Sequence, residues 1–284
     1  MRFLGIDGGG SKTSFLLVDE HDNELCHVQS GPSNYLSVGA DAAKEAIAQG
    51  ISQLTQKPDI VCAGFAGAGR PDNVAFYKNA LQSLIHDAQI IVESDAFIAS
   101  IGAIGMDPGI LLIAGTGSIA IGRDKDGAMF RAGGWGPYFG DEGSGFWIGR
   151  EAVRAALRSI DAESTTKFTD VVASGLGLKS VSEVVGAWAT GKLGVPEIAS
   201  LFPKVVAMYP SEPAGGILTE AAGHLRSLVE IASRRTRIED CRKSLIGSVA
   251  SHPVMRQLIG LDFVNPLRPP EWGAVIWARQ HVKP

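Results

Sequence analysis

The chain has 284 residues, of which 45% are hydrophobic and 20% charged, with a formal net charge of −4. This composition supports a buried core and excludes a largely disordered chain, and the length suits two domains. No basic run predicts a nucleic-acid surface, and no apolar run is long enough to span a bilayer. Asp7 breaks the first apolar stretch at once, which argues against a secretory leader. We therefore expect a cytoplasmic protein that binds neither nucleic acid nor membrane.

The three cysteines, Cys26, Cys62 and Cys241, are widely separated and form no Cys-x-x-Cys pair. This spacing predicts neither a zinc ribbon nor a local pair of iron–sulfur ligands. Reduced thiols in a cytoplasmic protein are the simple interpretation.

The first element is a short apolar strand that ends at Asp7 and runs into a glycine turn, after which a second apolar strand begins. Glycines let the backbone approach a ligand, and successive N–H groups in such a turn can hold an anion. Because Asp7 would repel a bare phosphate, it favours an intervening Mg²⁺ ion. On its own, the pattern is equally typical of an ordinary hairpin. The residues of this first expected phosphate site are Gly9, Gly10, Ser11, Lys12 and Thr13.

Strands and helices alternate after this hairpin. Two carboxylates, Glu93 and Asp95, follow a strand at residues 90–92, at the strand end where ligands bind in open α/β sheets. Asp95 can serve there as a general base or can cap the next helix, and its spacing alone does not separate the two roles. The other expected elements are a strand at 24–28, a loop at 31–35, a helix near 43–54, a strand at 60–65, and helices at 74–84 and 96–104.

The same pattern restarts at residue 110. A strand at 110–114, a second glycine turn, and strands at 119–122 and 128–131 repeat the order of the N-terminal unit. A repeat of a whole supersecondary unit is more informative than either turn alone. It predicts two lobes that offer two anion sites to one polyphosphate. The second expected phosphate site consists of Gly115, Thr116, Gly117 and Ser118.

The remaining chain is expected to be largely helical. A glycine-rich stretch at 133–145 precedes helices at 146–160 and 218–235, and the helical region between them is punctuated and uninformative. A short strand at 243–246 ends in the Gly247-Ser248 turn, and the last helix covers 271–282.

These motifs together resemble the N-acetylglucosamine kinase and glucosamine kinase group of the actin, hexokinase and heat-shock ATPase superfamily, which is classed with the ATPase activators of benzoyl-CoA reductase and 2-hydroxyacyl-CoA dehydratase. The most specific motif is Gly-Asp-Glu-Gly-Ser at 140–144, after Gly-Gly-Trp-Gly at 133–136. The resemblance implies an α/β fold of two actin-like (ribonuclease H-like) ATPase lobes around a nucleotide cleft. The lobes are expected at 1–108 and 109–284, the second with a helical insertion, and the last helix can pack back on the first lobe.

The resemblance also implies an activity: an ATP-dependent kinase that phosphorylates the 6-hydroxyl of N-acetylglucosamine or glucosamine, with ATP and Mg²⁺ as cofactors. Asp95 matches the catalytic aspartate of the group, and Asp7 is expected to hold Mg²⁺ through water. Gly247 and Ser248 are the expected adenosine contacts, at a turn where many relatives have two glycines. The expected sugar contacts are Asn34, Asp95, Gly117, Trp135 and Asp141.

Several of these residues have simpler interpretations. Asn34 suits a turn, Trp135 can be a core residue flanked by glycines, and Asp141 can be an N-terminal charge of the next helix. At the level of the whole chain, the alternatives are an ATPase activator that couples hydrolysis to a partner enzyme and a sugar-sensing regulator. The expected partners are a small sugar and ATP, and a homodimer is left open.

Overall fold

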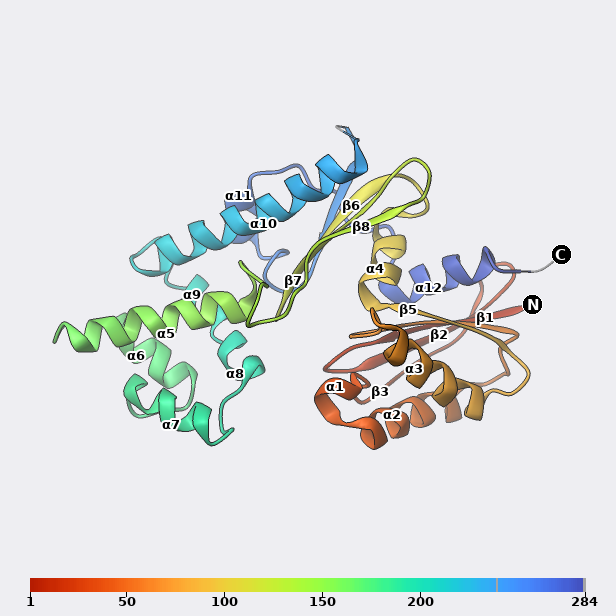
Figure 1. The fold of residues 1–284 in the computed structure, drawn as a ribbon, viewed down its shortest axis with the longest axis horizontal. Coiled ribbons are helices and arrows are strands. Elements are labelled where there is room, and N and C mark those ends of the chain that lie inside the picture. The colour runs from red at the N-terminus through yellow and green to blue at the C-terminus, as the bar shows by residue number, and fades with distance from the viewer. Residues whose placement is uncertain (239, 283–284) are drawn as a thin grey trace. The chain divides into compact units, whose positions relative to one another are not determined.

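The computed structural model describes residues 1–238 and 240–282, which form two α/β units, each with its own sheet (Figure 1). The first unit consists of residues 1–107 together with the segment from Asn265 on, and the second consists of residues 108–264. The sequence analysis drew the second lobe over 109–284 and allowed the last helix, at 271–282, to pack back on the first lobe. In the structure, the C-terminal segment lies with the first unit because helix α12 (Pro270–Arg279) packs against α4 and β1.

The sheet of the first unit has five strands in the order β3-β2-β1-β4-β5. Strands β1, β2 and β3 form an antiparallel meander, whereas β4 and β5 run parallel to β1. The carboxyl ends of these three parallel strands therefore meet at one edge. The strands are β1 (Arg2–Gly8), β2 (Thr13–Asp19), β3 (Glu24–Ser30), β4 (Ile60–Phe65) and β5 (Gln89–Ser94).

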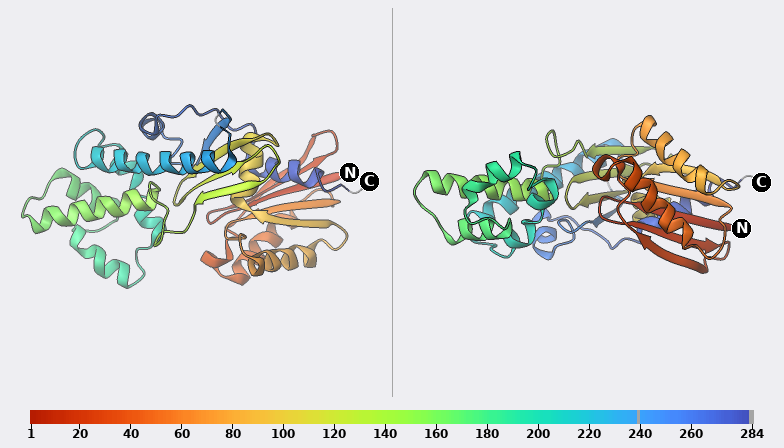
Figure 2. Two further views of the ribbon diagram at one scale, coloured as in Figure 1. Left: turned by 45° about the horizontal axis from the view of Figure 1, so that its top comes forward. Right: turned by 90° about the horizontal axis from the view of Figure 1, so that it is seen from below.

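Side-chain alternation gives this sheet two buried faces. On one face, Leu4 and Ile6 pack with Ile47 of α2 and with Leu81 of α3. On the other face, Phe3 packs with residues of α4 and α12. The two pairs of helices accordingly cover opposite faces of the sheet (Figures 1 and 2). The remaining helices of this unit are α1 (Tyr35–Val38), α2 (Ala40–Ser52), α3 (Pro71–Leu84) and α4 (Asp95–Ile104).

The sheet of the second unit has the order β8-β7-β6-β9, with an antiparallel meander β6-β7-β8 and with β9 parallel to β6. The first unit has the same arrangement in β1-β2-β3 and β4, which confirms the predicted repeat. β5 has no counterpart among the described strands of the second sheet. The strands are β6 (Gly109–Ala114), β7 (Ser118–Arg123), β8 (Met129–Gly133) and β9 (Arg242–Ile246).

The long helix α10 (Ala214–Thr236) packs on strands β6, β7 and β8, and α5 (Gly145–Asp161) packs with the short helices that follow it. These helices share one hydrophobic core with the sheet. In the described part of the chain, none of the helices has the length and apolar character needed to cross a membrane. The other helices are α6 (Lys167–Gly175), a 3-10 turn (Val181–Glu183), α7 (Val184–Ala189), α8 (Val195–Ala199), α9 (Phe202–Val206) and α11 (Pro253–Ile259).

Candidate active site

The first glycine turn joins β1 to β2 in the first unit. A hydrogen bond of 3.0 Å from Gly9 N to Lys12 O closes the turn, and Gly9 O accepts the N–H groups of Ser33 and Asn34 at 3.1 and 3.2 Å. Gly10, Ser11 and Lys12 are exposed at the tip. A Cβ added to Gly10 would meet no atom within 4 Å. The tip is thus open to a ligand, as the predicted phosphate site requires.

The two hydroxyl residues that follow the turns, Thr13 and Ser118, are buried. Thr13 is fully buried and its hydroxyl lies 2.8 Å from Gly31 O and 2.7 Å from the Ser33 hydroxyl. Ser118 is also buried, and its hydroxyl donates to Glu142 O at 2.8 Å. In the structure these hydroxyl groups hold the turns in place, and the assignment of Thr13 and Ser118 to the phosphate sites stays a prediction.

Asp7 lies at the end of β1, on the sheet face covered by α4 and α12. Its pKa is raised to about 7, mainly by burial and next by the negative charges of Asp95 and Glu271, against the lowering effect of Lys12. Glu271 lies in the first turn of α12 and is 7% exposed. A carboxylate with two acidic neighbours and one cation nearby is poorly compensated for an ionised group. This is the environment in which a bound cation would be favourable.

Asp95 is the first residue of α4, directly after β5. The helix is capped by Ser94, whose hydroxyl accepts the N–H of Phe97 at 3.2 Å. The Oδ1 atom of Asp95 accepts the adjacent N–H of Ala96 at 2.8 Å. Because Ser94 supplies the cap, capping does not explain a carboxylate at position 95. Burial raises the pKa of Asp95, which suits a proton acceptor.

The neighbouring carboxylate Glu93 has a structural contact. Trp277 Nε1 of α12 donates to Glu93 Oε1 at 3.1 Å, and burial raises the pKa of Glu93. Glu93 therefore ties the C-terminal helix to β5.

Asn34 precedes the short helix α1 and caps it: Oδ1 accepts the N–H of Leu36 at 3.2 Å. The turn interpretation of this residue is thus correct. The bond occupies Oδ1, and the Nδ2 amide group makes no hydrogen bond to the described residues. One residue can accordingly order the loop and still offer a donor to a ligand.

The second glycine turn, in the second unit, is held against the start of α5. Gly145 N donates to Gly115 O at 2.7 Å, and Phe146 N donates to Thr116 O at 3.2 Å. Thr116 is exposed at the tip of the turn. These bonds fix the turn to a long helix, which makes it a rigid platform.

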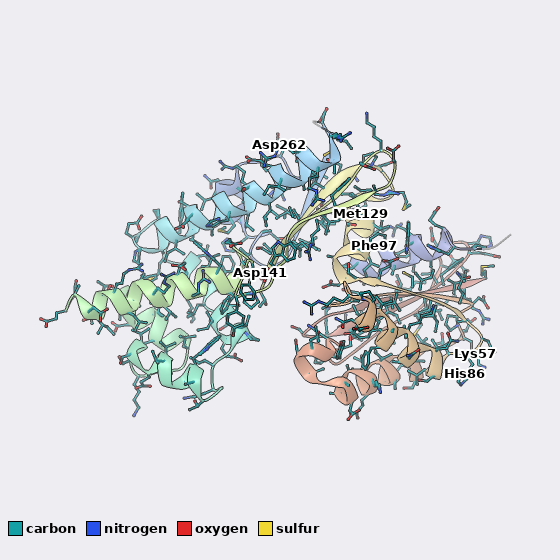
Figure 3. The ribbon with its side chains drawn as sticks, in the orientation of Figure 1. Lys57, His86, Phe97, Met129, Asp141 and Asp262 are labelled. Carbon is teal, nitrogen blue, oxygen red and sulfur yellow. The ribbon has the colours of Figure 1, made fainter. Side chains whose placement is uncertain are left out.

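Asp141 lies on the segment between β8 and α5 (Figure 3), with a left-handed backbone at φ 58°. Its Oδ1 accepts the N–H of Gly136 at 3.3 Å, and burial raises its pKa. A Cβ added to Gly117 would lie 2.7 Å from Asp141 Oδ2. The structure therefore brings Gly117 and Asp141 together. The first turn of α5 contains no acidic residue and Ser144 caps it, so Asp141 is not a charge of that helix turn.

Trp135 lies on the same segment and is 66% exposed. Arg131 stacks on its ring, with the guanidinium carbon 4.1 Å from the ring centroid. Trp135 is consequently a surface aromatic residue rather than a core residue.

A cavity of about 560 Å³ opens beside the second turn. Gly115, Thr116 and Ser248 line one end of it, and Phe202, Pro203 and Val206 supply an apolar wall. Gly247 has φ 98°, and a Cβ there would lie 2.3 Å from Ala114 O, so that only glycine fits. Ser248, in contrast, is exposed and faces the cavity. The size and apolar lining suit a nucleoside.

The family comparison agrees with this geometry. Residues 4–263 match the BadF/BadG/BcrA/BcrD ATPase family. The chain belongs to this ATPase family. Membership implies that the chain uses ATP.

Two curated relatives and one solved structure are similar over most of the chain. The chain is 37% identical to an N-acetylmuramic acid/N-acetylglucosamine kinase from Clostridium acetobutylicum, covering 82% of this chain and 81% of that protein. It is 29% identical to an N-acetyl-D-glucosamine kinase from Dictyostelium discoideum, over 97% of each. A proposed N-acetylglucosamine kinase from Chromobacterium violaceum superposes with a TM-score of 0.79 at 25% identity, covering 97% of this chain and 98% of that one.

Several residues of the site escaped sequence analysis. His252 lines the cavity, packs edge-on against Phe202 with ring centroids 5.5 Å apart, and accepts the Val254 N–H through Nδ1. The negative charge of Glu271 raises the pKa of Asp7, although the two residues are far apart in sequence. No local pattern marks either residue, since each reaches the site through tertiary packing.

Proposed function

We propose that this ATPase-family chain is an amino-sugar kinase, which transfers the γ-phosphoryl group of ATP to the 6-hydroxyl of N-acetylglucosamine. The proposal rests above all on Asp95, a half-buried carboxylate with a raised pKa at the carboxyl end of β5, in a chain similar to two N-acetylglucosamine kinases. A sugar hydroxyl must lose its proton as it attacks phosphorus, and a positioned carboxylate can accept that proton.

In this proposal Asp7 is the residue that binds the metal ion. Among the described residues, no group of three or more histidine, cysteine, aspartate or glutamate side chains could hold a metal ion by itself. Mg²⁺ commonly binds through one carboxylate, waters and phosphate oxygens, and the poorly compensated Asp7 fits that donor set. Bound Mg²⁺ would supply charge neutralisation for the phosphates. Asp7 would hold it through water, and the exposed N–H groups and Lys12 of the first turn would contact phosphate oxygens.

The remaining side chains and the cavity beside the second turn give the proposed contacts for the sugar and the nucleoside. The Nδ2 group of Asn34 and the carboxylate of Asp141 would bind ring hydroxyls and fix the direction of the 6-hydroxyl. Because Gly117 has no side chain, the carboxylate of Asp141 can lie beside it. The exposed ring of Trp135 offers an apolar surface to an acetamido group. The cavity beside the second turn would hold adenosine, with Gly247 and Ser248 at its edge.

The test is ADP release with MgATP across N-acetylglucosamine, glucosamine, N-acetylmannosamine and glucose, followed by NMR of the product. The expected result is the highest kcat/KM for N-acetylglucosamine, with phosphate on the 6-oxygen. A clear preference for glucose, or phosphate on the anomeric oxygen, would contradict the assignment.

The activator alternative is separated by a simple measurement. Those activators carry an iron–sulfur cluster on cysteines, whereas the described cysteines of this chain are free, and Cys62 is fully buried on β4. We expect colourless protein without bound iron after anaerobic purification. Stoichiometric iron with a visible absorption band would favour the activator.

A further inference from the structure

A tyrosine of α3 is bonded to the loop that carries Asn34. Tyr77 is fully buried, and its ring stacks on the ring of Phe65 with centroids 3.9 Å apart. Its hydroxyl group donates to Ser33 O at 2.9 Å and accepts the N–H of Tyr35 at 3.2 Å. These two partners are the residues directly before and after Asn34. One side chain therefore holds the backbone on both sides of a proposed sugar contact.

The ring and the hydroxyl group of Tyr77 have separate roles. The ring belongs to the hydrophobic core between the sheet and α3, and a phenylalanine ring would fill the same space. A buried hydroxyl group costs free energy unless it is hydrogen-bonded, so it does not improve the core by itself. The two shorter hydrogen bonds of this hydroxyl group go to the loop, and Ala66 O lies at the longer distance of 3.5 Å. The loop, and not the core, therefore explains the hydroxyl group.

The loop is also held by the first glycine turn. The N–H groups of Ser33 and Asn34 donate to Gly9 O at 3.1 and 3.2 Å. With these bonds and the Tyr77 hydroxyl group, the backbone of Asn34 is held from two sides. Its Oδ1 atom accepts the N–H of Leu36, so the Nδ2 group has a defined direction. The direction of this amide donor thus depends on the Tyr77 hydroxyl group.

A second polar side chain of α3 holds the same region. Asn73 lies one helical turn before Tyr77, on the same face of α3, and is 6% exposed. Its Oδ1 accepts the hydroxyl group of Tyr35 at 2.6 Å, and its Nδ2 donates to Gly67 O at 2.5 Å. A Cβ added to Gly67 would lie 3.7 Å from Asn34 Oδ1, so Gly67 borders the same loop. Helix α3 therefore fixes the loop through two buried side chains.

We propose that Tyr77 is a positioning residue for the acceptor sugar: its hydroxyl group holds the Asn34 loop so that the Nδ2 group of Asn34 meets a ring hydroxyl. Tyr77 does not touch the sugar, because it is fully buried. The inference rests on the proposed function, and it assigns part of the sugar affinity to a residue outside the binding surface. Asn34 would bind the ring and not the reacting 6-hydroxyl, so the effect falls on KM for the sugar rather than on kcat.

The experiment is a double-mutant cycle of Tyr77→Phe and Asn34→Ser. Tyr77→Phe removes only the hydroxyl group, and Asn34→Ser removes the amide donor but keeps a side chain that can cap α1. Loss of a positioning hydrogen bond supports a rise in KM for N-acetylglucosamine of about 5- to 20-fold in Tyr77→Phe, with kcat and KM for ATP within about twofold. In the Asn34→Ser background, Tyr77→Phe should change KM for the sugar by less than about twofold, because the donor that it positions is gone.

A control and a second variant complete the experiment. Ser100→Ala removes another buried hydroxyl group of the same unit, which donates to Phe97 O of its own helix at 2.7 Å, and KM for the sugar should not change. Circular dichroism shows whether each variant is folded. If Tyr77→Phe does not fold, Tyr35→Phe takes its place in the cycle, because it removes the bond from the loop to Asn73. Its effect on KM should show the same dependence on Asn34.

Three results would overturn the positioning role. The first is an unchanged KM for the sugar in Tyr77→Phe. The second is an equal effect of Tyr77→Phe in both Asn34 backgrounds, which would show that the hydroxyl group does not act through Asn34. The third is a fall in kcat with an unchanged KM for the sugar. That result would place the effect at Asp95, whose negative charge, after burial, contributes to the raised pKa of Tyr77.

Failure of the proposed function is distinguishable, because it is seen in wild-type protein before any substitution. Calorimetry with N-acetylglucosamine and ADP release with MgATP are measured first. If wild-type protein neither binds nor phosphorylates this sugar, the proposed function fails, and the positioning role fails with it. If wild-type protein does both, the cycle tests the positioning role alone.

Discussion

Replacing Asp7 with asparagine tests the statement that this carboxylate is held at a cost to stability. Its pKa rises from 3.8 to about 7 in the folded chain, mainly through burial. Each pH unit corresponds to 1.36 kcal/mol, so ionised Asp7 costs the folded state up to about 4 kcal/mol. The sign follows from proton binding: between pH 4 and 7 the folded state keeps a proton that the unfolded chain has lost. Stability therefore falls as pH rises through this range, and the full cost is present above pH 7.

The asparagine variant lacks this ionisation. Allowing for solvent access and relaxation, we expect it to be more stable than wild type at pH 8.5 by about 1–3 kcal/mol, which corresponds to a rise in Tm of about 2–10 °C. Near pH 4 the difference should vanish. The same variant should lose most of its activity, because the proposed Mg²⁺ ligand is gone.

The assay is thermal unfolding of the protein without ligand at both pH values, monitored by circular dichroism. Asp87→Asn, which changes an exposed carboxylate of the same unit, is the control and should shift neither curve. An Asp7→Asn variant that is no more stable than wild type at pH 8.5 would refute the electrostatic reasoning.

Other predictions concern the nucleoside cavity, the acceptor site and pH. His252→Asn keeps a capping side chain for α11 but removes the imidazole ring that lines the cavity. We expect KM for ATP to rise about 3- to 10-fold with KM for the sugar unchanged. An unchanged KM for ATP would show that His252 does not contribute to the nucleotide site. Gly117→Ala should displace Asp141 and raise KM for the sugar at least about 10-fold. Gly223→Ala, where an added Cβ meets no atom within 4 Å, is the neutral control. Equal kinetics for the two variants would contradict the proposed role of Asp141. For wild type, kcat/KM for MgATP should decline as pH falls below about 7, because Asp7 takes up a proton, and a flat profile down to pH 5 would argue against that dependence.

The local pattern of the sequence was sufficient for the strands, the turns and the repeat. Each glycine turn follows a strand of five or more buried or half-buried residues, and such a pattern depends only on neighbours in the chain. The ends of the helices were predicted less accurately than their positions. Helix α3 begins at Pro71, three residues before the expected start at 74, because proline occupies the first turn of the helix, where its missing N–H is not needed.

The roles of side chains that depend on tertiary contacts could not be predicted in this way. The hydroxyl of Thr13 has the same sequence context as a phosphate ligand, but its buried bonds to Gly31 and Ser33 appear only once β3 is paired with β2. Likewise, Ser94 and Asp95 are both good capping residues, and only the hydrogen bond from Phe97 shows which of them caps α4. His252 and Glu271 reach the site from distant segments, so no spacing rule could have found them.

The proposal that Asp95 accepts the proton of the sugar hydroxyl is tested most directly by Asp95→Asn. The variant keeps the size of the side chain and leaves the Ser94 cap in place, so the fold should be retained. Removing a general base costs about 10²–10⁴ in kcat. The decisive measurement is kcat with N-acetylglucosamine, together with the affinity for the sugar by calorimetry. We predict a loss of kcat of that size with sugar affinity changed by less than about 10-fold, and near-normal turnover by a folded Asp95→Asn protein would contradict the assignment.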